Sequence, residues 1–495
     1  MIDNFIAGSV ALFGDPFTIG IFVFGVIGGM LFGAIPGVSM LTLAAILLPF
    51  TANLEPAQGV MLFAVIYCTG TYGGAITAIL FNIPGAPENA PTAFDGYPMT
   101  RKGQSGKAVG AAVLCSAIGG VTSAIVMMAA TEPLANWAIS NIGPPEIFAL
   151  VFFGLAVASS VGGRTLWKGW MSVLLGLLIA TIGQDPVGGI NRYNFGFSDL
   201  AAGIAFVPAI LGFFAVSEIF VQAEKKAIGM YEAPKLSLDF PTILELWTHK
   251  IAVVRSILVG FFCGILPGIG ATLAAFMGYG EAVRWSKNKE SFGKGNLEGV
   301  ISSETANNAA TGAAMIPLLA LGLPGGALTA MMVAVFQMHD LEPGPLVFYN
   351  SPDLIWIVFA AMFYANLSIL FIGLLETKTI LYLLKIPFQF LAPMILLLAS
   401  IGSYIGRGLV LDVMVMFISG IMGFLLRRSG YSITGIVLGI ILGKIGEQNF
   451  AQGMQMVHYD LLEYLSRPIC LLLIVAGSLT LLAGIYKALS FSFKS

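Results

Sequence analysis

The stretch "FGAIPGVSM" (Phe32–Met40) places a proline and a glycine inside a long apolar run, and "CGILPGIGA" (Cys263–Ala271) does so again. Proline removes an amide donor and clashes with the preceding turn, and glycine allows a sharp turn. Backbone groups freed at such a break cannot face lipid, so they must be buried in protein or line a wet cavity. The two stretches therefore predict membrane helices that are interrupted at Pro36 and at Pro267.

The composition is that of a membrane protein. Hydrophobic residues make up 57% of the 495 residues and charged residues only 10%, whereas a soluble domain carries about 25% charge. The mean hydropathy is +0.90. Apolar runs of spanning length recur along the whole chain and do not alternate, which favours helices over strands. The four cysteines show no metal-ligand spacing, and we expect neither a cofactor nor a bound metal beyond a co-transported Na⁺ or H⁺.

The distribution of Lys and Arg predicts the topology. Twenty of the 24 basic residues fall in one set of connecting segments, and the other set holds only Arg192, Arg407, Lys444 and Arg467. The positive-inside rule places the larger set in the cytoplasm. The N-terminus then lies outside the cell membrane and the C-terminus in the cytoplasm. Segments 17–50 and 251–282 each return to the side from which they entered, and they enter from opposite faces.

The two halves of the chain share a pattern. At an offset of 231, Gly29, Gly33, Pro36 and Gly37 match Gly260, Gly264, Pro267 and Gly268. At an offset of 240, residues 58–86 match 298–326 without a gap, and the identities include Thr71 with Thr311, Pro84 with Pro324 and Gly85 with Gly325. Interrupted helices in matching positions of two inverted halves are typical of secondary transporters.

We therefore predict an all-α polytopic membrane protein of two inverted-topology repeats, with Pro-Gly-broken re-entrant hairpins and about 11–14 transmembrane segments. The first repeat is 1–224, a cytoplasmic linker is 225–250, the second repeat is 251–450, and a C-terminal transmembrane helix lies in 451–495. Each repeat holds one hairpin and five spans. The expected spans after each hairpin are 56–82, 106–131, 146–163, 166–184 and 200–221, and then 298–323, 354–377, 386–403, 408–426 and 432–446, with 467–487 at the end.

The stretch "EGVISSETANNAATGAAMIP" (298–317) is the least lipid-like of these spans. Glu304, Asn308 and Thr311 are spaced so that they share one helical face. An acid at membrane depth is costly and points to function. The alternative is that these polar groups only join helices by hydrogen bonds, with the neighbouring alanines allowing close approach. Gly25, Gly29 and Gly33 form a similar small-residue face, for which close helix packing is the expected role.

Hydroxyls and amides also surround the breaks in the first half. They suit a carboxylate ligand and a hard cation such as Na⁺. We take as candidate substrate-binding residues Pro36, Gly37, Ser39, Thr71, Asn82, Pro84, Gly85, Pro267, Gly268, Thr272, Asn307, Asn308, Thr311, Pro324 and Gly325. Candidates for the coupling ion are Ser39, Thr42, Glu304 and Asn308. Arg192, in the outer segment "GQDPVGGINRYNFGF" (183–197), either meets an anion or a partner protein or pairs locally with Asp185 or Asp199.

The chain resembles the large membrane subunit of the tripartite tricarboxylate transporters over nearly its whole length. The resemblance rests on six stretches, "GAIPGVSMLTLAAILLPFT" (33–51), "YGGAITAILFNIPGAPENAPTAFDGYPMTRKGQSGKAVG" (72–110), "GPPEIFALVFFGL" (143–155), "DPVGGINRYNFG" (185–196), "GILPGIGATLAAF" (264–276) and "SSETANNAATGAAMIPLLALGLPGG" (302–326). It implies an ion-coupled importer of small carboxylates with an elevator motion. The implied partners are a periplasmic solute-binding protein and a small four-helix membrane subunit. The run Ala86–Asn89 departs from the family pattern, so the resemblance leaves the carboxylate open, with citrate as the default.

Two other classes of function remain open. One is a passive anion channel of the same architecture, since the repeat favours a carrier but does not exclude a pore. The other is an intramembrane enzyme. The sequence argues against this class, because it has no HExxH motif, no paired aspartates and no Ser/His arrangement at membrane depth.

Overall fold

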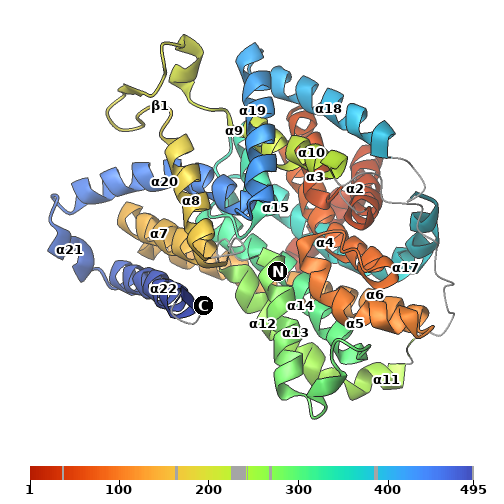
Figure 1. Cartoon of the computed structure of the whole chain (residues 1–495). Coiled ribbons are helices and arrows are strands. Elements are labelled where there is room, and N and C mark those ends of the chain that lie inside the picture. Colours follow the sequence, from red (N-terminus) through yellow and green to blue (C-terminus); the bar gives the residue numbers. More distant parts are fainter. Residues whose placement is uncertain are drawn as a thin grey trace.

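The computed structural model describes residues 1–35, 38–161, 166–224, 241, 243–266, 270–383 and 388–492, and its architecture is helical apart from one pair of two-residue strands (Figure 1). Among these described residues, six helical segments are long and apolar enough to cross a membrane. They are α2 (Pro16–Ala34), α4 (Pro56–Phe81), α6 (Ser105–Asn141), the run from α9 (Phe206–Ile210) through the π-helical η4 (Leu211–Val216) to α10 (Ser217–Glu224), the first part of α17 (Pro352–Leu383), and α19 (Val410–Arg428). The predicted all-α class is confirmed.

The remaining elements are shorter or less apolar. The other α-helices are α1 (Ile2–Gly14), α3 (Met40–Leu47), α5 (Ala90–Arg101), α7 (Pro144–Val161), α8 (Leu166–Ala180), α11 (Ile243–Thr248), α12 (Lys250–Ile265), α13 (Gly270–Trp285), α14 (Leu297–Leu321), α15 (Ala327–Met338), α16 (Val347–Asn350), α18 (Phe388–Ile405), α20 (Ile433–Met456), α21 (Leu461–Ser466) and α22 (Pro468–Ser492). Single 3₁₀ turns are η1 (Leu48–Asn53), η2 (Pro87–Asn89), η3 (Ser198–Ala202) and η5 (Lys289–Ser291). Strands β1 (Gly183–Gln184) and β2 (Asn191–Arg192) form a small antiparallel pair, with Gly183 opposite Arg192.

Three helices form the centre of the molecule. α14 packs along α6, and α4 contacts both. α2 covers α4, α12 and α13 cover α14, and α17 lies against α4 and α6. The most apolar part of α4 is completely buried, so this helix is enclosed by protein. The core therefore holds the two segments that the sequence pairs at an offset of 240.

Glycines set the distance between the covering helices and the central ones. A side chain on Gly33 of α2 would overlap the carbonyl oxygen of Gly70, which explains why the small-residue face predicted on α2 packs closely. A side chain on Gly264 of α12 would overlap the carbonyl oxygen of Ala310 in the same way. Gly264 and Ala310 are the residues that correspond to Gly33 and Gly70 by sequence offset.

α4 and α14 end in the same manner. Asn82 follows α4 with a left-handed backbone (φ 58°), and Gly322 follows α14 likewise (φ 74°). The N–H of Asn82 donates to Ala78 and that of Ile83 to Thr77, and Gly322 and Leu323 repeat both bonds at an offset of 240. Pro84 and Pro324 stand two residues beyond each cap, where a helix cannot continue. The predicted breaks before these prolines are confirmed, whereas Pro36, Gly37, Pro267 and Gly268 lie outside the described residues.

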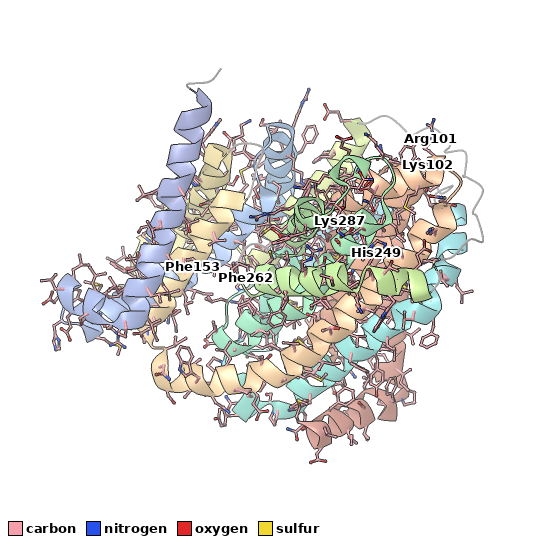
Figure 2. The ribbon with its side chains drawn as sticks, turned by 90° about the horizontal axis from the view of Figure 1, so that it is seen from below. Arg101, Lys102, Phe153, His249, Phe262 and Lys287 are labelled. Carbon is pink, nitrogen blue, oxygen red and sulfur yellow. The ribbon has the colours of Figure 1, made fainter. Side chains whose placement is uncertain are left out.

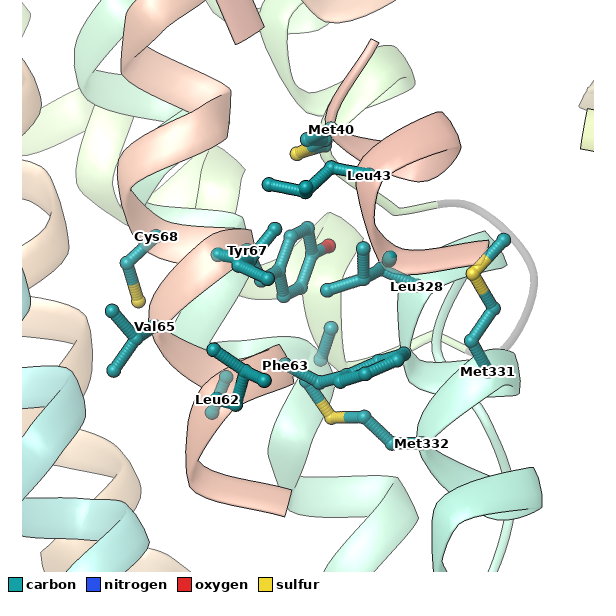
Figure 3. Packing of buried hydrophobic residues seen from close by; sticks show 14 of the residues in the cluster. Met40, Leu43, Leu62, Phe63, Val65, Tyr67, Cys68, Leu328, Met331 and Met332 are labelled. Carbon is teal, nitrogen blue, oxygen red and sulfur yellow. The ribbon is translucent and has the colours of Figure 1, made fainter. Parts of the chain in front are cut away.

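The helices that follow the breaks pack into the core. α3 and α15 both lie against α4, and Figure 3 shows Met40 and Leu43 of α3 and Leu328, Met331 and Met332 of α15 around Phe63 and Tyr67. α15 was not among the expected spans because twelve residues are too few to cross a bilayer.

The outer helices form two further groups. α20 packs on α7 and α8, and α22 packs on α7, at the left of Figure 1. α19 packs on α9, η4 and α10, and α18 adjoins η4. In both groups a helix from one half of the chain is held by helices from the other half, so the halves are interleaved.

Several expected boundaries were wrong. α6 runs on to Asn141 through Pro133, ten residues past the expected end, and α20 continues to Met456. The expected span 200–221 begins instead with a 3₁₀ turn and contains the π-helical η4. α1 was not predicted at all, and it lies on α17, where Gly8 touches the backbone of Trp356. Figure 2 shows Arg101 and Lys102 together at one edge of the molecule and Lys287 nearer its middle, in a view from below that also shows the apolar side chains Phe153 and Phe262.

Candidate functional site

Polar side chains from both halves meet in the middle of the molecule. We call this group the central polar cluster. It consists of Thr71, Glu88, Asn89, Thr92, Ser116, Thr272, Ser303, Glu304, Asn307, Asn308 and Thr311. The first five come from α4, η2, α5 and α6, and the others from α13 and α14. The part of the cluster on α14 is closed to solvent, since all of its members there are fully buried, whereas Thr272 on α13 is partly exposed.

Glu304 lies at the centre of the cluster and accepts four hydrogen bonds. Thr92 Oγ1 donates at 2.5 Å and Ser116 Oγ at 3.0 Å, and the side-chain amides of Asn307 and Asn89 donate at 3.4 and 3.5 Å. Within the part of the chain that the structure describes, no ion pair includes Glu304. The sequence placed Glu304 among the coupling-ion candidates, but it did not identify Thr92, Ser116 or Asn89 as its partners.

Glu88 is a second buried carboxyl, on the rim of the cluster. Its side chain is 5% exposed and accepts a bond from Thr272 Oγ1 at 3.4 Å. The Asn307 amide donates to the backbone carbonyl of Glu88 at 3.4 Å. The segment that departs from the family pattern, Ala86–Asn89, therefore contributes two members of the site.

Asn308 and Thr311 face the side of the cluster nearest α4. Asn308 donates to the Glu304 carbonyl (3.2 Å) and to Asn307 Oδ1 (2.8 Å), and its own Oδ1 is buried without a partner. Thr311 Oγ1 donates to the Asn308 carbonyl and lies 3.8 Å from Cys68 Sγ. Asn366 of α17 is near Cys68, and its buried Oδ1 also lacks a partner. A buried amide oxygen without a partner in the protein is a position that a bound water or ion commonly satisfies.

The other predicted residues contribute differently. Thr71 joins the cluster only through its backbone carbonyl, which accepts from the Asn89 amide at 2.8 Å, and its hydroxyl donates to the carbonyl of Tyr67 in its own helix. Pro324 and Gly325 are buried, with Gly325 against Ala314. Asn82 is exposed at the end of α4, and Pro84 and Gly85 follow it in the loop.

On α3, Thr42 has a buried hydroxyl with no partner, while Ser39 precedes the helix without a capping bond from its side chain.

Two features away from the cluster bear on function. An apolar hollow of about 330 Å³ between α2 and the α3–η1 segment is lined by Phe17, Phe24 and Phe50, and its lining suits an apolar chain rather than a carboxylate. Arg192 on β2 forms a bidentate pair with Glu447 of α20, at 2.5 and 2.9 Å, so neither local partner expected from the sequence is the one it uses.

An all-helical chain with membrane-length helices around a closed polar centre defines a polytopic membrane protein. Residues 19–438 match the tripartite tricarboxylate transporter TctA family, and the chain belongs to this family of membrane transporter subunits. Membership makes it a multi-pass transport protein and not an enzyme.

Two relatives come from Agrobacterium vitis. One, described as an uncharacterized 52.8 kDa protein in the TAR-I ttuC' 3' region, is 35% identical over 92% of this chain and 90% of its own length. The other, described as an uncharacterized protein in the TAR-II ttuC' 3' region, is 36% identical over 44% of this chain and 90% of its own length. No solved structure matches the chain.

Proposed function

We propose that this chain is the transport subunit of a binding-protein-dependent secondary transporter that imports small carboxylates, driven by a Na⁺ or H⁺ gradient. The observation that carries the proposal is the central polar cluster. Amides and hydroxyls from both halves of the chain converge at the centre of an apolar bundle. Buried polar groups of this kind are costly in a membrane protein unless they serve a substrate or ion pathway.

We further propose that 1–224 and 251–450 are inverted repeats joined by the linker 225–250, with re-entrant hairpins at 17–50 and 251–282. The matched contacts support this. Gly33 meets Gly70 as Gly264 meets Ala310, and the ends of α4 and α14 carry equivalent hydrogen bonds. The outer helices fit the same relation, because α20 packs on α7 and α8 as the α9–α10 segment packs on α18 and α19.

The substrate would bind between the helix breaks of the two halves. α13 begins at Gly270 and α5 at Ala90, both beside the cluster, and the partial positive charge of a helix N-terminus favours an anion. Asn307, Asn308 and Thr272 would orient the carboxylate. One domain would then carry the site across the membrane in an elevator motion and release the substrate into the cytoplasm.

The partners follow from the family. A periplasmic solute-binding protein would deliver the carboxylate to the outer segments, and a small four-helix subunit would complete the complex in the inner membrane. The N-terminus would be periplasmic and the C-terminus cytoplasmic. Single cysteines placed at Val187 and at Lys287 in a chain without its four native cysteines test this orientation. Only the cysteine at 187 should react with an impermeant maleimide in intact cells. Labelling of the cysteine at 287 alone would indicate the opposite orientation.

Uptake into proteoliposomes tests the function. The chain is reconstituted with its small subunit and a candidate binding protein, and uptake of radiolabelled citrate and other di- and tricarboxylates is followed under a Na⁺ gradient, a pH gradient or neither. We expect uphill, saturable uptake that one gradient drives, that is lost in Asn308→Ala and that persists in Asn350→Ala, an exposed asparagine outside the cluster. Gradient-independent flux that does not saturate would identify a passive anion channel instead.

A further inference from the structure

Four side chains around Glu304 donate hydrogen bonds to its carboxyl group. Two hydroxyls and two side-chain amides point their hydrogens at its two carboxylate oxygens. The carboxyl is fully buried. An ionised carboxyl at this depth without a cation needs these bonds, and even with them its burial is costly. Glu304 is therefore a group that gains from neutralisation.

The two amides are held with their nitrogens toward Glu304. Asn89 Nδ2 also donates to the backbone carbonyl of Thr71 at 2.8 Å, a bond that the amide oxygen is unable to form. Asn307 Oδ1 accepts from Asn308 Nδ2 at 2.8 Å, and Asn308 is itself fixed by its bond to the Glu304 carbonyl. The orientation of each amide is thus set by a backbone carbonyl, which accepts hydrogen bonds and is unable to donate them.

This arrangement discriminates between the two coupling ions. Na⁺ requires several oxygen ligands, and N–H groups do not coordinate a cation. Two of the four neighbours of Glu304 present N–H groups in fixed orientations, so a Na⁺ ion at the carboxylate would face them as repulsive dipoles. A proton needs only one acceptor.

The hydroxyls next to Glu304 provide that acceptor. When a proton binds Glu304 Oε1, the new O–H donates to Thr92 Oγ1. The Thr92 hydroxyl then turns its hydrogen to Ser303 Oγ, 3.0 Å away, in a bond for which either atom serves as donor. Ser303 Oγ already donates to the Gly299 carbonyl at 2.9 Å, which completes the chain. Each of these hydroxyl hydrogens has a hydrogen-bond acceptor whether Glu304 is ionised or protonated.

We infer that Glu304 is the proton-binding group of this chain and that the coupled ion is H⁺ rather than Na⁺. The coupling part of this inference rests on the proposed function, whereas proton binding by Glu304 stands on the geometry alone.

Other titratable groups face α14 from every element packed against it. They are Tyr67 and Cys68 on α4, Glu88 on η2, Asp95 on α5, Cys115 on α6, Arg255 and Cys263 on α12 and Tyr279 on α13. Arg255 lies 3.7 Å from Glu298 at the beginning of α14, and Asp95 bonds to Tyr279 and to backbone amides. The cation on this list is thus engaged at the end of the helix, away from Glu304.

Infrared difference spectroscopy on the purified full-length chain tests proton binding without a substrate. On acidification, the C=O stretching band of a protonated, buried carboxyl should appear in the wild type and in Glu298→Gln, the same substitution six residues earlier on the same helix. The band should lose the Glu304 contribution in Glu304→Gln, in which Glu88 and Asp95 remain as buried carboxyls, and that contribution should return, shifted, in Glu304→Asp. Replacing choline chloride with NaCl at constant pH should leave the carboxylate bands unchanged.

Two results would overturn the inference. One is an undiminished protonation band in Glu304→Gln. The other is a NaCl-induced change in the carboxylate bands of the wild type that Glu304→Gln removes, which would make Glu304 a Na⁺ ligand. Glu304→Asp keeps the test valid if the glutamine variant does not fold.

The coupling ion is then read from citrate uptake in proteoliposomes. A pH gradient of one unit should support about tenfold accumulation for each proton that enters with the substrate. Uptake that follows the Na⁺ gradient at equal pH would refute H⁺ coupling. Absence of uptake of every carboxylate tested would refute the proposed function, and the infrared result would still decide whether Glu304 binds the proton.

Discussion

Asp95 joins the two halves of the chain, and its removal is the sharpest test of the packing described above. This fully buried carboxyl on α5 accepts the N–H groups of Gly295 and Asn296 at 2.8 Å each and the hydroxyl of Tyr279 at 2.9 Å. Gly295 and Asn296 precede α14, so Asp95 fixes the beginning of that helix against the first half of the chain. Asp95→Ala leaves all three donors without their acceptor.

The size of the effect follows from the number and environment of these bonds. A hydrogen bond to a charged group contributes about 1.5–3 kcal/mol, and a buried donor left unpaired costs about 1–3 kcal/mol. The amides and the tyrosine are only partly buried, so water replaces some of the lost bonds. We expect Asp95→Ala to lower the free energy of unfolding by about 2–4 kcal/mol. Asp95→Asn keeps an oxygen for both amides, and its loss should be about 1 kcal/mol.

A thiol-reactive fluorogenic dye suits the measurement, because all four cysteines are buried and react only when the protein unfolds. A loss of 1 kcal/mol in the free energy of unfolding lowers the midpoint of thermal unfolding by about 2 °C. The thermal midpoint of Asp95→Ala should therefore fall by roughly 4–8 °C and that of Asp95→Asn by much less. Glu342→Ala, an exposed acid in a loop, is the control that should not change. Equal midpoints for Asp95→Ala and wild type would show that the connection does not hold the halves together.

Three further results are expected. Gly33→Ala should destabilise the protein by about 1–3 kcal/mol in the same dye assay, because its methyl group overlaps a carbonyl of α4. Gly14→Ala is the control and should not destabilise it, because no atom lies within 4 Å of the added carbon. Equal thermal midpoints for the two variants would contradict the close packing. Arg192→Ala should cost less than about 1 kcal/mol, since its pair with Glu447 is partly exposed, and the wild-type midpoint alone should fall when salt is added. The backbone amides that donate to Asp185 hold its pKa below the usual 3.8, so its stabilisation of the turn before β2 is complete above that pH and is lost as the pH falls through the lowered value. The rate of cleavage of this turn by pepsin in the wild type, divided by the rate in Asp185→Asn at the same pH, should therefore increase at the acid end.

The central helix ends were predictable because local chemistry determines them. The expected spans 56–82 and 298–323 correspond closely to α4 and α14, since a left-handed cap and a proline two residues later stop a helix regardless of its surroundings. α1 and α15 were missed because neither is long enough to span a bilayer. α1 is held by contact with α17, and α15 by burial against α4. Those contacts join residues hundreds of positions apart.

The candidate site was predictable only in part for the same reason. The density of polar residues in 302–311 marks α14 in the sequence, and Glu304, Asn307 and Asn308 lie in the cluster as a group. Ser116 and Asn366 are single polar residues in apolar helices, where the sequence does not distinguish a ligand from a hydrogen bond between helices. Thr92 lies in a stretch rich in glycine and proline that resembles a loop. Only the packing of α5 and α6 on α14 brings Thr92 and Ser116 to Glu304.

The division of the cluster between the halves has a mechanical consequence under the proposed function. Any step that draws α6 away from α14 breaks the bond from Ser116 to Glu304. A bond to an ionised carboxyl contributes about 1.5–3 kcal/mol, compared with about 0.5–1.5 kcal/mol for a neutral pair, so the same separation is easier once Glu304 carries a proton. The ionised state would then hold the helices together, and the protonated state would release them. In a carrier with this property the bound proton lowers the cost of separating α6 from α14, and symport requires in addition that the site not move when the proton is bound without the carboxylate.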